Sequence, residues 1–286
     1  MKNPSYYCYK KPVSALIRSY QIAVIVLLFF LLFFTACKGV STENSNSSSG
    51  KSASPAGQST PSGASEMVSG ACANAYYPVA AGIKREYRVS YENNAMKPAT
   101  YTETLVDIMP DSFKVKTAFA EGGTGVTHGW KCSGDGLAAL EYANVNLANQ
   151  NQSNMQLDIE TISAKGVFIP AENNWKIGYK WSNEYNVAGT MKGTGAMPSG
   201  EMKSNVTLEH EIIGEESVTV PAGTFTTFKV KSKITQKGTM QMTTGPAVSV
   251  PMNVSFDLIM YQAKGIGLVK SVIEKAATTE LLSYTK

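Results

Sequence analysis

Residues 112–119 read Ser-Phe-Lys-Val-Lys-Thr-Ala-Phe, which places Phe113, Val115, Thr117 and Phe119 at every second position. Successive side chains of a β-strand point to opposite faces, so these four would share one face. A period of two over such a length predicts a half-buried strand.

The same period recurs across residues 71–286, separated by turn signals such as Pro110-Asp111, Gly122-Gly123 and Pro221-Ala222-Gly223. Its alternating sets are Tyr87, Val89, Tyr91; Trp175, Ile177, Tyr179, Trp181; Val206, Leu208; Phe228, Val230; and Val254, Phe256, Leu258. We therefore predict a mainly β fold for 71–286, as a curved antiparallel sheet, half-barrel or barrel-like structure. One short helix is predicted over Leu137–Asn149.

Three pieces of this region occur twice in the same order. Residues 77–87 are similar to 168–179, residues 109–115 to 221–230, and residues 130–137 to 261–268. One interpretation is an internally duplicated half-sheet. The other is that alternating strands and glycine turns resemble each other through composition alone.

The N-terminus has the composition of a secretory leader. Four basic residues precede thirteen consecutive apolar residues at 22–34, a run too short to cross a bilayer of about 30 Å. Phe34-Thr35-Ala36-Cys37 resembles the bacterial lipobox, which implies a lipoprotein signal peptide at 1–36 and acylation of Cys37, for example with palmitate. An ordinary signal peptide and a retained anchor helix are the alternatives.

The next segment, 37–70, is predicted to be the lipidated cysteine followed by a disordered tether. Twenty of the 33 residues in 38–70 are Ser, Gly, Thr or Pro, and none is aromatic, so little apolar surface is available for burial. Without the four basic residues of 1–36, the chain has 22 basic and 22 acidic residues. The composition therefore gives no reason to expect a nucleic-acid partner.

The cysteines predict a disulfide in the folded part. Cys8 lies in the leader and Cys37 would carry lipid, which leaves Cys72 and Cys132 in a compartment that permits disulfides. A metal site is the rival, but two cysteines 60 residues apart without a second cysteine pair do not have zinc spacing.

Catalytic and metal-binding patterns are weak. The only histidines are His128 and His210, and on a strand His210 would point away from Glu209 and Glu211. Asp158 and Glu160 share a predicted face and are interpreted as a solvated edge. We expect no enzyme, no cofactor and no metal centre.

Candidate ligand-facing residues are the aromatic set Trp175, Tyr179 and Trp181 and the methionines Met240 and Met242. Seven of the 12 methionines fall in 191–260. Thioethers suit adaptable apolar surfaces and also Cu(I). The simpler interpretation is that both sets belong to the core.

Several of these pieces together resemble a known family. Cys72 with Tyr76-Tyr77-Pro78, Trp130 and Cys132, the turn at 220–225, and Gly265-Ile266-Gly267-Leu268-Val269 look like bacterial secreted proteins of the domain-of-unknown-function 3108-like group. The resemblance implies an envelope β-domain, supports the Cys72–Cys132 pairing and implies no activity.

The expected function is that of a non-enzymatic binding or structural module, lipid-anchored to a membrane of the cell envelope and facing the periplasm or the exterior. The expected partners are the membrane and an unknown protein or small hydrophobic ligand. The alternative is a carrier of a hydrophobic ligand in a curved-sheet cavity.

Overall fold

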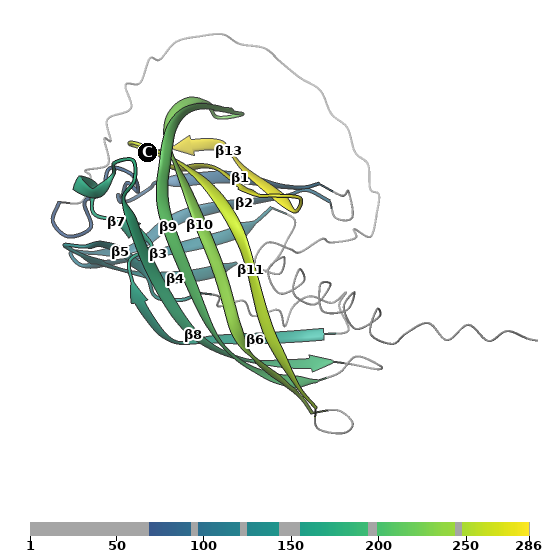
Figure 1. Cartoon of the computed structure of the whole chain (residues 1–286). Coiled ribbons are helices and arrows are strands. Elements are labelled where there is room, and N and C mark those ends of the chain that lie inside the picture. The colour runs from purple at the N-terminus through teal and green to yellow at the C-terminus, as the bar shows by residue number, and fades with distance from the viewer. Residues whose placement is uncertain are drawn as a thin grey trace, which may run out of the picture. The chain divides into compact units, whose positions relative to one another are not determined.

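The computed structural model of the chain describes residues 69–92, 97–120, 125–142, 155–193, 199–243 and 248–285. These residues form one antiparallel sheet with the strand order β6-β8-β9-β10-β11-β12-β13-β1-β2-β3-β4-β5-β7 (Figure 1). The strands are β1 Lys84–Tyr91, β2 Ala99–Met109, β3 Ser112–Phe119, β4 Val126–Ser133, β5 Gly136–Ala139, β6 Met155–Gly166, β7 Ile169–Pro170, β8 Lys180–Gly193, β9 Gly200–Val220, β10 Gly223–Met242, β11 Val248–Ala263, β12 Gly267–Ile273 and β13 Ala277–Thr285. One 3₁₀ turn, Glu172–Asn174, follows β7.

The curved antiparallel sheet predicted from the sequence is confirmed, and the sheet is not closed within the described residues. Its two outer strands are β6 and β7. Among these residues no helix is long and apolar enough to cross a membrane.

The strand order matches the proposed duplication. Strands β1 to β5 pair in sequence as one antiparallel meander, and β8 to β12 pair in sequence as another. The turns also correspond, since Gly136 opens β5 with φ 133° and Gly267 opens β12 with φ 102°. Each meander has one additional strand beside its first strand. Strand β13 pairs with β1, and strand β6 pairs with β8.

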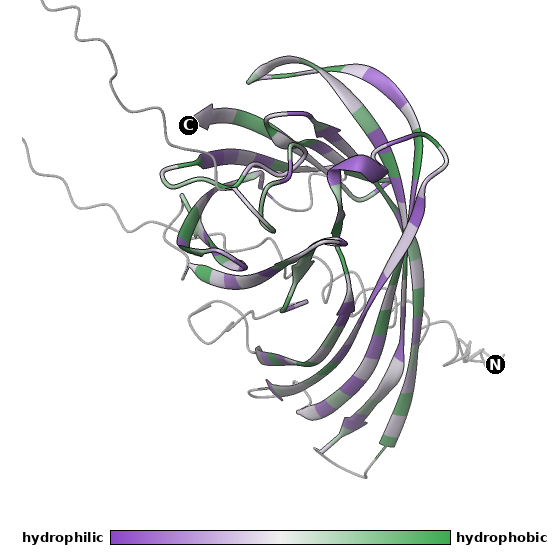
Figure 2. Ribbon diagram, turned by 90° about the vertical axis from the view of Figure 1, so that its left-hand side faces the viewer, coloured by the Kyte–Doolittle hydropathy of each residue, from purple (hydrophilic) through white to green (hydrophobic). Residues whose placement is uncertain are grey.

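The two meanders have unequal lengths. Strands β1 to β4 contain 8, 11, 8 and 8 residues, whereas β8 to β11 contain 14, 21, 20 and 16. Figure 1 shows β9, β10 and β11 curving along their length, and Figure 2 shows hydrophilic and hydrophobic residues alternating along them. Each of the strands β8 to β11 is therefore longer than the strand of the first meander to which it corresponds.

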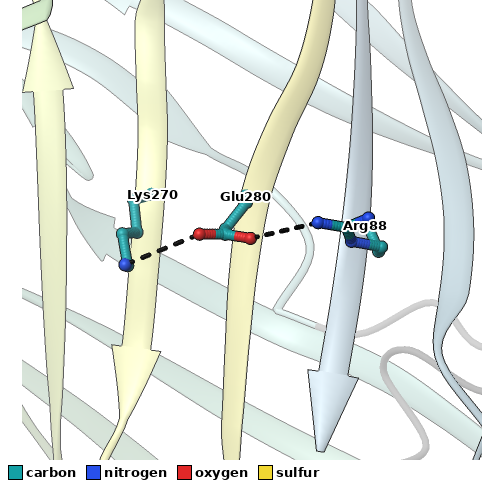
Figure 3. Close-up of polar contacts among 3 residues, drawn as sticks. All are labelled: Arg88, Lys270 and Glu280. Carbon is teal, nitrogen blue, oxygen red and sulfur yellow. Dashed lines mark hydrogen bonds and ion pairs between the residues drawn. The ribbon is translucent and has the colours of Figure 1, made fainter. Parts of the chain in front are cut away.

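The meanders meet at the β12–β13–β1 seam. Glu280 on β13 lies between Lys270 on β12 and Arg88 on β1, at 3.6 and 3.4 Å (Figure 3). All three side chains are partly solvent-exposed, so each ion pair contributes at most about 1 kcal/mol.

The core is filled by the segment that precedes β1. The Tyr76 ring stacks on the ring of Trp175, which lies just before the second meander, with ring centroids 4.2 Å apart. The Tyr77 ring stacks on Trp130 of the first meander, with ring centroids 5.1 Å apart. Cys72 forms a disulfide with Cys132 of β4. These contacts place residues 72–80 as a wedge between the two halves of the sheet.

Hydrogen bonds also join this wedge to residues of the second half of the chain. Asn74 Nδ2 donates to the carbonyl of Pro170 at 2.8 Å, and the Gly265 amide donates to the carbonyl of Ala75 at 2.7 Å. Arg85, which is fully buried, donates to the carbonyls of Pro78 and Ile266. The wedge is thus bonded to turns far along the chain.

Two local predictions are wrong. Leu137 to Ala139 belong to β5 rather than to a helix, because they pair with β4, and residues 143–149 lie outside the described part. Trp175, Ile177 and Tyr179 precede β8 instead of lying along it, because Gly178 turns the chain with φ 86°. Ile177 is consequently 63% exposed.

Removal of the disulfide should destabilise the domain strongly. The Cys72→Ser, Cys132→Ser double variant frees a loop of 60 residues, which in the chain-entropy model costs about 4 kcal/mol. Urea unfolding followed by tryptophan fluorescence measures this. Wild type under reductant should behave like the variant, and equal midpoints for oxidised wild type and variant would contradict the prediction.

Gly136 should tolerate no side chain. A Cβ there would lie 2.1 Å from the Ile169 carbonyl oxygen, and its φ of 133° is unfavourable for other residues. Gly136→Ala should therefore lower the free energy of unfolding by at least about 1–3 kcal/mol. Gly134→Ala is the matched control, because nothing lies within 4 Å of its Cβ position. Equal unfolding curves for the two variants would show that this contact is unimportant.

Candidate functional site

A layer of polar side chains crosses the inner face of the second meander. His210 on β9 contacts Ser232 Oγ on β10 through Nδ1 at 2.6 Å and Asn183 Oδ1 on β8 through Nε2 at 2.7 Å. Its ring stacks on Trp181 at 4.8 Å and meets Phe168 edge-on. All three polar residues are buried.

The hydrogen bonds and the burial of the ring together assign the tautomer of His210. The Asn183 oxygen can only accept, so Nε2 carries the proton, and because burial favours the neutral ring, Nδ1 accepts from the Ser232 hydroxyl. Burial lowers the pKa of His210 to about 4, and Glu209 and Glu211 occupy the alternate positions on the strand, toward the opposite face. His210 is therefore a neutral group with both nitrogens engaged.

The polar layer divides the inner face in two. On one side lies the disulfide core, which includes Ile212, Val230 and Met260. On the other lies a surface that we call the distal floor, made of alternate residues of β8 from 183 to 191, β9 from 200 to 208, β10 from 234 to 242 and β11 from 250 to 256. None of the side chains of the distal floor is charged.

Methionines and glycines lie side by side in the distal floor. Gly189 pairs with Met202, which pairs with Met240, and Gly200 pairs with Met242 on the next row. A Cβ on Gly189 would meet Met202 Cε at 3.3 Å, and one on Gly200 would meet Met242 Sδ at 3.4 Å. The flexible thioether side chains thus lie over positions that have no side chain, which gives an apolar surface able to adjust its shape.

The opposite face of the same strands is charged. Lys231 pairs with Asp257 at 2.8 Å, and Lys180 pairs with Glu211 at 3.3 Å. A hollow of about 530 Å³ across β6, β8 and β9 is lined in part by Asp158, Glu160 and Glu201. Among the described residues, no group of His, Cys, Asp and Glu is arranged to hold a metal ion.

The residues singled out in the sequence fall into two places. Trp175, Tyr179 and Trp181 pack together in or against the disulfide core, whereas Met240 and Met242 lie in the distal floor. Met240 is 5% exposed and Met242 is half-buried. The structure does not bring these two sets into one site, and Cys37 lies outside the described residues.

Sequence reasoning missed Asn183 as a site residue. Asn183 is 3% exposed, its Oδ1 accepts from His210, and its side chain also interacts with the Tyr185 hydroxyl. The available signal was a lone Asn at an inward position of an alternating strand, two residues before Tyr185. Asp158 and Glu160 are exposed on the edge strand β6, as expected.

The chain belongs to the DUF3108-like family, whose sequence model matches residues 125–285. This range begins just before β4 and excludes Cys72 and the Tyr76-Tyr77-Pro78 stretch. No curated protein matches the chain.

Two solved structures are similar to this one. The first, described as an exported protein with a YmcC-like fold from Bacteroides fragilis, shares 16% identity over 75% of this chain and 100% of its own, with a TM-score of 0.43. The second, described as a lipoprotein from Parabacteroides distasonis, shares 14% identity over 75% of this chain and 99% of its own, with a TM-score of 0.44. Both descriptions apply to the two solved structures and not to the present chain.

Acidification should destabilise the domain through His210. Its folded pKa of about 4 lies below the ordinary value of 6.5, so the stability due to neutral His210 is present above pH 6.5 and is lost as pH falls toward 4. Between pH 7 and 4.5 the loss should be on the order of 2–3 kcal/mol. Urea unfolding at both pH values measures it.

His210→Gln should remove most of this difference. His128→Gln is the comparison, because burial also lowers the pKa of His128, and Glu141 opposes that effect. An unchanged pH dependence in His210→Gln would contradict the assignment of His210 as a buried neutral group.

Proposed function

We propose that the chain is a lipid-anchored cell-envelope protein whose β-domain is a non-enzymatic binding module, with the distal floor as its binding surface. The observation that supports this proposal is the difference in length between the two meanders. Both have the same strand order, but β8 to β11 are longer than β1 to β4, and their part beyond the disulfide core holds the uncharged, methionine-rich distal floor.

A scaffold alone gives no reason for this extension. The wedge, the disulfide and the aromatic contacts of Tyr76 and Tyr77 all lie on the core side of the His210 layer. About ten residues per strand lie on the other side, where they add apolar surface that is not part of the disulfide core cluster. Because these inward side chains are apolar and almost fully buried, a partner that binds among them must itself be hydrophobic.

The absence of an activity is part of the proposal. A catalytic histidine needs a free nitrogen and a nucleophile within reach, whereas both nitrogens of His210 are engaged by Ser232 and Asn183 in a layer closed by aromatic rings. These contacts support a structural role for the histidine.

The anchor follows from the lipobox-like Phe34-Thr35-Ala36-Cys37. Two acyl chains on Cys37 would hold the protein stably on a membrane facing the periplasm or the exterior. A tether of 33 residues has a reach of roughly 30 Å, so the domain would stand clear of the bilayer and could still approach a ligand in it.

Native mass spectrometry of the full processed chain, extracted from its own envelope, tests the binding function. We expect a folded mass above the denatured mass, because a bound partner is lost on denaturation. Met240→Glu should abolish the extra mass by placing a charge in the distal floor, whereas Gln241→Glu, the next residue on the exposed face, should retain it.

Two controls keep this test independent of folding. The Cys72–Cys132 bond and the tryptophan emission spectrum report whether Met240→Glu has folded. Equal folded and denatured masses for the wild-type chain would overturn the binding function whatever the variants do.

A further inference from the structure

Exposed apolar side chains gather at the end of the sheet where the chain enters the domain. Of the six large apolar side chains that are exposed in the described part of the chain, three belong to this end: Met109 at 58%, Ile177 at 63% and Ile213 at 41%. We call these three the apolar rim. Single exposed apolar side chains are ordinary on a protein surface, so the arrangement of the three decides whether they matter.

Two backbone irregularities bring Ile177 and Ile213 together. The Gly178 amide donates to the Ile212 carbonyl at 2.7 Å, and the Ile212 amide donates to the Tyr179 carbonyl at 3.0 Å. The two isoleucines are therefore neighbours on adjacent segments. Gly178 turns the chain with φ 86°, and Ile213 is the extra residue where the register of β9 shifts against β10. Such irregularities re-aim side chains, and here both direct an isoleucine to solvent.

The chain enters the domain between the members of the apolar rim. The sulfur of Cys72 lies 3.9 Å from the Met109 carbonyl oxygen. Four residues further on, the Tyr76 ring stacks on Trp175, two residues before Ile177. This short segment therefore runs from one part of the apolar rim to the other, and the predicted tether joins the domain at the same end.

The charges beside the isoleucines are neutralised within the protein. Lys180 pairs with Glu211 at 3.3 Å, and Lys264 pairs with Glu172 at 3.3 Å. A lipid surface that approaches these points therefore does not have to desolvate a lone charge. Lys176, in the same turn, is exposed and forms no ion pair within the described ranges, which suits it to a phospholipid phosphate.

The predicted tether makes a weak contact with its own membrane sufficient. A linker of 33 residues has a reach of roughly 30 Å and holds the domain near the bilayer at an effective concentration on the order of millimolar. A few apolar side chains bind a bilayer only weakly by themselves, but even a weak contact is populated at such a concentration. The tether permits a raised and a resting position, and the apolar rim favours the resting one.

We infer that the domain rests with its apolar rim on the phospholipid bilayer that carries the Cys37 anchor, with Ile177 and Ile213 inserted among the headgroups. This inference rests on the proposed lipid anchor and adds the orientation of the domain on its membrane. Asp111 and Glu215 are exposed and lie two residues from members of the rim. They disfavour a strongly anionic surface, so a zwitterionic lipid is the appropriate probe.

The test places a fluorophore beside the apolar rim. The acylated chain has no free cysteine once Cys72 and Cys132 are paired, so Lys176→Cys accepts a single nitrobenzoxadiazole (NBD) label. Gln241→Cys, on the exposed face of β10, is the labelled control. Each full acylated chain is reconstituted into phosphatidylcholine vesicles, and quenching of NBD by doxyl-labelled lipid is measured. We expect at least about threefold stronger quenching at position 176 than at 241, and no change at about 1 M salt, because the contact is apolar.

The double substitution Ile177→Ser, Ile213→Ser is the diagnostic variant. It should lower the quenching at position 176 to the level seen at 241, because the apolar contact is lost. Ile162→Ser is the matched control, since Ile162 is 60% exposed and is likewise the extra residue of a bulge, on β6. It should leave the quenching unchanged. All three isoleucines are exposed, so the unfolding curves of these variants should stay close to that of wild type.

The outcomes separate the orientation from the anchor. Flotation with the vesicles and the mass of the N-terminal peptide report acylation at Cys37. If the chain floats but position 176 is quenched no more than 241, or if the double variant keeps the quenching, the resting orientation falls and the anchor stands. If the NBD emission instead shifts with chain concentration in detergent, the rim binds a second copy and the inference falls. If the chain carries no acyl group and does not float, both fall.

Discussion

The fold depends on filling the concave side of an open sheet. A curved sheet of this width leaves its inner face unpaired unless something packs inside it, and residues 72–80 do so. Tyr76 faces the second meander, Tyr77 faces the first, and the Cys72–Cys132 bond holds the wedge between them. Because the disulfide limits how far the unfolded chain can separate these parts, one covalent bond stabilises contacts in both meanders.

Sequence patterns predicted what depends on a single strand. The alternation at Phe113 and Val115 identified β3, because the burial of one face follows directly from the period. The pattern failed where backbone geometry overrides it, as at Gly178, whose positive φ turns the chain just before β8. It failed also over Leu137–Ala139, where pairing with β4 outweighs a spacing that is compatible with a helix.

The distal floor was accessible from the sequence only in part, for a related reason. The local excess of methionine is visible in the sequence, but the pairing of Met202 with Gly189 and Met240 is set by register between strands. A shift of one residue would turn these side chains to the charged face, so no single-strand pattern reports the arrangement. Asn183 was not recognised as a site residue because its contact with His210 depends on the register between β8 and β9, which only the coordinates show.

The His210 layer connects the stability of the scaffold with the properties of the distal floor. Its histidine is hydrogen-bonded through both ring nitrogens, to Ser232 and to Asn183, which lies at the boundary with the floor. A satisfied layer stabilises the strands in one register, which a surface of small and flexible side chains such as Gly189 and Met202 does poorly by itself. The rigid core can therefore hold four long strands in place, while the buried methionines beyond the layer pack with the pliability of unbranched thioether side chains. In this division, the first meander and the wedge supply stability, and the extension of the second meander supplies the surface that we propose for binding.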